Sequence, residues 1–128
     1  MTAEDAVREY YEALRRGDPL YPYFAETESA WKGAISTHHE GYDAIAEALR
    51  EQTRTTDDWT VESRALSVRE RASFATLTDA VHLAWTATED GTRHEFDTRW
   101  SGTLVPAGEG KERDWAFEVL HVSAPREL

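Results

Sequence analysis

The chain of 128 residues contains no cysteine and only two lysines, Lys32 and Lys111, against twelve arginines. Without cysteine there is no disulfide framework and no thiolate chemistry. The sequence also lacks an apolar run of about 18 residues that could span a bilayer, and its N-terminus lacks the basic and apolar segments of a secretory signal. No glycine-rich phosphate loop, nucleophile elbow or basic stripe is present. We therefore expect a soluble cytoplasmic protein.

Acidic residues dominate the charge, with 25 Asp and Glu against 14 Lys and Arg and a net charge of −11. Such a charge argues against a nucleic acid or an anionic membrane as partner. An acid excess with few lysines is typical of proteins from a salt-loving host. An arginine bias from a GC-rich genome, combined with ordinary acidity, explains it nearly as well. The length predicts a single domain over residues 1–128, long enough for a core of its own.

An Asp-Gly pair separates two long runs rich in β-branched and aromatic residues, within residues 73–104. Asp90-Gly91 predicts a hairpin with a two-residue type I′ turn, in which both central residues have positive φ. That turn fixes three cross-strand pairs: Trp85 with Phe96, Val81 with Trp100, and His82 with Arg99. Because side chains alternate between the faces of a strand, one face is apolar and the other polar.

The rest of the chain predicts helices first and strands afterwards. Apolar spacing and terminal residues predict a helix over residues 3–16, a short helix over 18–24 and a third over 42–54. Extended segments are predicted over residues 28–33, 59–68 and 114–124, with a polar connection over 34–41. Helices grouped ahead of an antiparallel sheet indicate an α+β fold with the helices packed on one face of the sheet.

Three stretches carry a resemblance to a known family: AVREYYEALRRGDPLYPYFAE at residues 6–26, AWKGAISTHHEGYDAIAEAL at 30–49 and DWAFEVLHVSAP at 114–125. In this order they resemble the SnoaL-like group of the nuclear transport factor 2-like superfamily. The resemblance implies a curved antiparallel or mixed sheet wrapped around about three N-terminal helices. It also implies a cone-shaped cavity between sheet and helices, and a homodimer. The superfamily includes ketosteroid isomerase, scytalone dehydratase, limonene epoxide hydrolase, polyketide cyclases and binding proteins, so the fold does not settle the function.

Two titratable residues are candidates for catalysis. His121 falls on the predicted face of Trp115 and Phe117, where it acts as a general acid/base or as a hydrogen-bonded structural histidine. Asp79 is the one acid on the apolar face of the hairpin. A carboxylate in an apolar cavity suits proton abstraction next to a carbonyl, whereas a bulge would turn Asp79 outward.

Two polar groups have simpler explanations than chemistry. On the polar hairpin face, His82, Asp97 and Arg99 either orient a hydrolytic water or form cross-strand charge pairs, and we favour the pairs. The His38-His39 pair lies in the polar connection and suggests a metal site at first. Adjacent residues of an extended segment point to opposite sides, so we predict no metal and place His38 near the mouth of a pocket.

The aromatic content predicts a small-molecule pocket with no cofactor. Its expected members are Tyr11, Phe24, Trp31, His38, Trp85, Phe96, Trp100, Trp115 and Phe117. The leading interpretation is a domain that binds a small apolar or carbonyl-bearing molecule. The alternatives are a cofactor-independent isomerase, polyketide cyclase or dehydratase that uses Asp79 or His121, and a module whose cavity is filled by its own side chains.

Overall fold

A computed structural model describes residues 1–126 and 128. The helices are α1 (Ala3–Arg16) and α2 (Tyr42–Thr55), with a short 3-10 helix, η1 (Tyr21–Tyr23). The strands are β1 (Trp31–Gly33), β2 (His38–Glu40), β3 (Thr56–Ser63), β4 (Ser67–Glu70), β5 (Ala75–Ala87), β6 (Arg93–Pro106) and β7 (Trp115–Ser123). Together they confirm the predicted α+β class.

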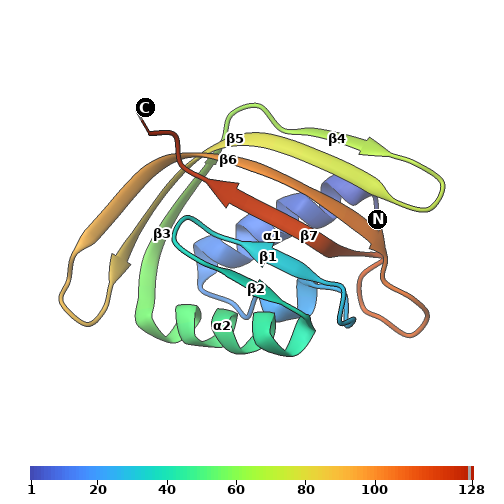
Figure 1. The fold of residues 1–128 in the computed structure, drawn as a ribbon, viewed down its shortest axis with the longest axis horizontal. Coiled ribbons are helices and arrows are strands. Elements are labelled where there is room, and N and C mark those ends of the chain that lie inside the picture. The colour runs from blue at the N-terminus through green and yellow to red at the C-terminus, as the bar shows by residue number, and fades with distance from the viewer. Residues whose placement is uncertain (127) are drawn as a thin grey trace.

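The strands form one curved sheet in the order β2-β1-β7-β6-β5-β3. β4 lies off this path and pairs with the first four residues of β5, 75–78. β1 and β7 run parallel, and the other pairs are antiparallel, so the sheet is mixed. The sheet curves over α1, and α2 lies below the β1–β2 hairpin (Figure 1). No described helix has both the length and the apolar character needed to cross a bilayer.

The ends of α1 lie where the sequence predicts them. Thr2 and Asp5 form a reciprocal capping box, which satisfies backbone N–H groups at the start of the helix. Gly17 ends it with φ 72°, a left-handed conformation that glycine adopts without steric cost. The segment predicted as a short helix over 18–24 contains only the 3-10 turn η1. Pro22 lacks the backbone N–H that a longer helix through this position would need. Two α-helices therefore support the sheet, where about three were expected.

Two strands differ from the sequence-based boundaries. The connection over residues 34–41 contains β2, which pairs with β1 and positions Lys32 opposite His39. The extended segment predicted over 59–68 is divided into β3 and β4. The division follows Ser63, and both strands pair with β5.

The register of the β5–β6 hairpin differs by two residues from the predicted one. Leu83 lies opposite Phe96, and His82 lies opposite Asp97. The turn has four residues, 88–91, and only Gly91 of the Asp-Gly pair has positive φ, so the type I′ turn was a wrong prediction. A shift of two residues keeps every side chain on its face, and the predicted apolar and polar faces therefore survive the error.

A bulge in β7 overturns the face predicted for the last strand. Thr103 pairs with Val119, but Leu104 pairs with Phe117, which leaves Glu118 as an extra residue. Beyond the bulge the alternation is reversed: Leu120 is fully buried, whereas His121 is exposed. His121 therefore does not share the inward face of Phe117.

Candidate functional site

A cavity of about 220 Å³ lies between the inner face of the sheet and the helices. Its walls come from α1, α2, the inner faces of β1, β3, β5, β6 and β7, and the β1–β2 connection. The exposed residues Ile35, Ser36 and Thr37 of that connection form part of its rim. The tip of the β1–β2 hairpin points toward β3 in Figure 1. Segments from most of the length of the chain thus enclose one space.

Three tryptophans, Trp59, Trp85 and Trp100, line this cavity. Trp59 on β3 stacks on Trp85 of β5, with 4.8 Å between ring centroids, and Phe96 stacks behind Trp85 at 5.6 Å. The Trp59 indole donates to Thr56 Oγ1 at 2.9 Å, and Trp100 donates to Thr98 Oγ1 at 3.0 Å. Because these N–H groups already have acceptors, Trp59 and Trp100 offer mainly apolar surface to a ligand.

Lys32 is the one charged residue among those that line the cavity. It pairs with Leu120, whose buried side chain faces the cavity, and paired residues of parallel strands point the same way. Burial lowers the pKa of the Lys32 amine to about 8. Within the described part of the chain no carboxylate lies within 4 Å of this amine.

Lys32 was missed at the sequence level because Trp31 was assigned to the cavity. Alternation along β1 allows only one of these neighbours to point inward. The structure places Trp31 on the outer face, where its ring stacks on His38 and meets the edge of His121, each at 5.7 Å. Gly33 makes this possible, since a Cβ there would lie 2.3 Å from the Trp31 ring. The predicted residues Trp31, His38 and His121 thus lie together, but away from the cavity.

Asp79 points inward as predicted, yet it is not among the residues that line the cavity. It is 5% exposed, and its carboxylate accepts hydrogen bonds from Tyr11 Oη at 2.7 Å, Ser63 Oγ at 2.6 Å and the Ala65 N–H at 2.9 Å. Burial and the bond to Asp79 raise the pKa of Tyr11. The carboxylate thereby joins α1, β3 and β5, and its catalytic role stays a prediction.

The remaining predicted pocket residues divide between the core and a second hollow. Phe117, 1% exposed, packs on Tyr10 at 5.2 Å in the core. Phe24 and Trp115 line a hollow of about 220 Å³ beside η1. Of the nine predicted pocket residues, Trp85 and Trp100 are the two that line the cavity between the sheet and the helices, and Phe96 stacks on Trp85.

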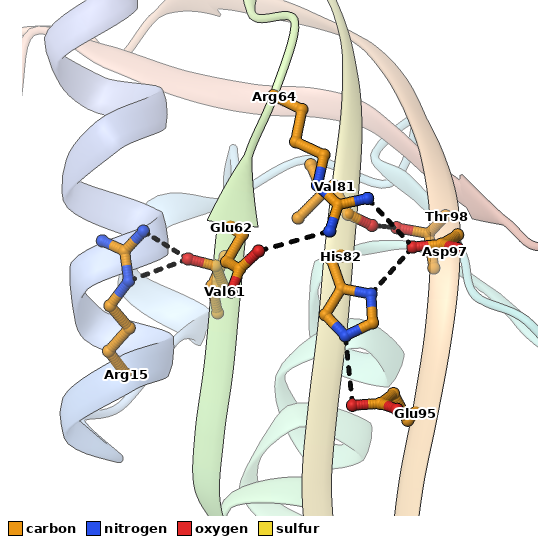
Figure 2. Close-up of polar contacts among 9 residues, drawn as sticks. All are labelled: Arg15, Val61, Glu62, Arg64, Val81, His82, Glu95, Asp97 and Thr98. Atoms are coloured by element: carbon orange, nitrogen blue, oxygen red, sulfur yellow. Dashed lines mark hydrogen bonds and ion pairs between the residues drawn. The ribbon is translucent and has the colours of Figure 1, made fainter.

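The polar group predicted on the outer face is a network of charge pairs. Figure 2 shows His82 between two carboxylates, with Nδ1 2.8 Å from Asp97 and Nε2 3.2 Å from Glu95. Arg64 contacts the same Asp97 oxygen at 3.3 Å. Hydrogen bonds to Asp97, and then to Glu95, raise the pKa of His82, and those from His82 lower the pKa of Asp97. Arg99 is on the same face, opposite Ala80. Among the described residues, no hydrogen bond joins Arg99 to this network.

Comparison with known proteins agrees with the fold. The sequence matches the SnoaL-like domain over residues 3–127, and no curated protein matches it significantly. A nuclear transport factor 2-like superfamily protein from Salmonella enterica serovar Typhimurium superimposes with a TM-score of 0.80 at 17% identity, covering 96% of this chain and 88% of that one. For a ketosteroid isomerase-like protein from Erwinia carotovora atroseptica the TM-score is 0.74 at 19% identity, with coverage of 97% and 94%. Since the domain match spans nearly all residues, the chain belongs to the SnoaL-like domain family, and its fold is that of the nuclear transport factor 2-like structures.

Proposed function

We propose that this protein binds a small apolar or carbonyl-bearing molecule in the tryptophan-walled cavity. The observation that carries the proposal is the cavity itself: about 220 Å³ of space bounded by Trp59, Trp85 and Trp100. Small-ligand sites are usually concave and apolar, with few polar groups. An engineered apolar cavity of about 150 Å³ accommodates benzene, so this one suits a molecule of one or two fused rings.

The enzymatic alternative has less support from the geometry. A cofactor-independent isomerase, cyclase or dehydratase needs a general acid or base that reaches the bound substrate. Asp79 is outside the cavity lining, and its carboxylate already accepts three hydrogen bonds. His121 is on the other face of the sheet. Resemblance to a ketosteroid isomerase-like protein at 19% identity supports the fold and not this chemistry.

Filling the cavity tests the proposal. Gln52 lines it from α2 and is only partly buried, so Gln52→Trp should place an indole in the space with little strain on the core. Ala44→Trp adds the same side chain at an exposed position of α2 and serves as control. In isothermal titration with 2-naphthamide, we expect binding to wild type and Ala44→Trp and at least a tenfold loss in Gln52→Trp. Equal affinity in all three proteins would contradict the proposed site.

We also propose that the protein forms a homodimer through the polar outer face of the sheet or its edge. The support is the chain's resemblance to the SnoaL-like family and the mixed character of that face, which carries threonines together with His82 and Arg99. Light scattering at micromolar concentration should give twice the chain mass of 14.6 kDa. A monomer at both low and high salt would rule the dimer out.

A further inference from the structure

We propose that the cavity selects ligands that carry an anionic group, a carboxylate above all, and that Lys32 binds this group. The inference rests on the proposed function and deepens it by naming the chemical class of the ligand. An apolar molecule alone would need no lysine in the wall. A flat molecule with a carboxylate at one end matches both parts of the site, the tryptophan wall and the amine.

The described residues that line the cavity supply Lys32 with no counter-charge. A lysine withdrawn from water normally has a carboxylate partner or places its amine in solvent. The cavity lining has no Asp, Glu or His, and Tyr10 is its one other titratable residue. From β2, His39 lies opposite Lys32 but is not part of the lining, and α2 contributes the uncharged Gln52. A ligand carboxylate would supply the counter-charge that the described residues do not.

The other lysine of the chain shows the ordinary arrangement. Lys111 lies in the loop before β7, and its Nζ is 3.0 Å from Glu26 Oε1 on the surface. In a chain with 25 acidic residues, an inward lysine without such a partner is unusual. The lowered pKa of Lys32 also reflects the lack of a partner, since burial without a counter-charge disfavours the protonated amine. A bound anion would raise this pKa again, because it favours the protonated amine.

A matched pair of probes separates this inference from the proposed function. 2-Naphthoate and 2-naphthamide have nearly the same shape, and only the first is anionic. Near neutral pH, we expect wild type to bind the naphthoate about 10- to 100-fold more tightly, as for a hydrogen-bonded ion pair in a partly buried site. Lys32→Met should remove this preference and leave the affinity for the amide within about threefold. Lys111→Met removes the same charge outside the cavity and should retain the preference.

The outcomes are distinguishable. If both probes bind wild type equally, the inference about the anion is wrong while the cavity remains a binding site. If neither binds, the proposed function itself is contradicted. Should Lys32→Met fold poorly, Lys32→Arg must keep the preference, and in wild type the preference must fall as the pH rises past about 8, where the amine loses its proton. A preference that is unchanged at high pH would overturn the role of Lys32.

Discussion

At the scale of single residues, Asp79 is the polar group most deeply tied into the fold. Its oxygens accept hydrogen bonds from Tyr11, Ser63 and the backbone of Ala65. Asp79→Asn places an amide among donors, and we expect it to lower the free energy of unfolding by about 2–3 kcal/mol. Urea denaturation of Asp79→Asn, Tyr11→Phe and the double variant should show coupling between the two residues. Additive effects would mean that the bond contributes nothing.

Through Lys32, the stability of the protein should depend on pH in the direction opposite to that expected for a salt-bridged lysine. Its pKa is about 8 in the folded protein and near the ordinary value of 10.5 when unfolded. Between these values the unfolded chain holds more protons, so stability should rise with pH, by up to about 3 kcal/mol. Lys32→Met should be more stable than wild type near neutral pH, and the difference should shrink by pH ~10.5. Parallel stability curves for the two proteins would contradict the burial of the amine.

His82 should stabilise the protein on the acidic side. Its carboxylate partners raise its pKa, so the stabilisation is complete below the ordinary histidine pKa and is lost as the pH rises through the raised value. The urea midpoint of His82→Gln should approach that of wild type as the pH increases beyond this range. His39→Gln is the control, because no carboxylate within the described residues contacts His39 at ion-pairing distance.

At the scale of elements, the bulge of β7 decides which residues of that strand reach the core. A Cβ on Gly102 would lie 2.3 Å from the Val119 carbonyl oxygen, so alanine at this position must displace backbone. We expect Gly102→Ala to cost roughly 1–3 kcal/mol or more, while Ser101→Ala, at the exposed neighbouring position, should cost little. Thermal melts measure both. If the two variants melt together, β7 does not approach β6 as closely as described.

The same element shows what sequence reasoning could and could not reach. The limits of α1 and the hairpin faces follow from local signals: a capping box, a terminal glycine and strict alternation. The position of His121 depends on one extra residue in β7, and the alternation of apolar and polar residues in the sequence does not reveal a bulge. Gly102 inside a strand was the available signal, since an interior glycine often marks a bulge or a close backbone approach. An error of one residue in the predicted alternation thus placed His121 in the cavity wrongly and left Lys32 out.

At the scale of the whole molecule, the net charge of −11 should make stability depend on salt. Screening weakens repulsion among the acids more than it weakens exposed ion pairs such as Arg8–Glu4, which contribute little. We expect the melting temperature to rise by several degrees from dilute buffer to about 1 M potassium chloride. Sodium chloride at the same ionic strength is the control and should give a similar rise, because screening depends on ionic strength. A flat or falling melting temperature in potassium chloride would remove both the repulsion argument and the hypothesis of a salt-loving host.

The cavity that the curved sheet encloses above the helices is the feature on which the functional account depends. Crystals grown with 2-naphthoate test it most directly. We expect density for the two rings between the β1–β2 connection and the wall of Trp59, Trp85 and Trp100. We also expect the carboxylate within hydrogen-bonding distance of Lys32 Nζ. A cavity closed by the protein's own side chains, or a probe bound only elsewhere on the molecule, would contradict it.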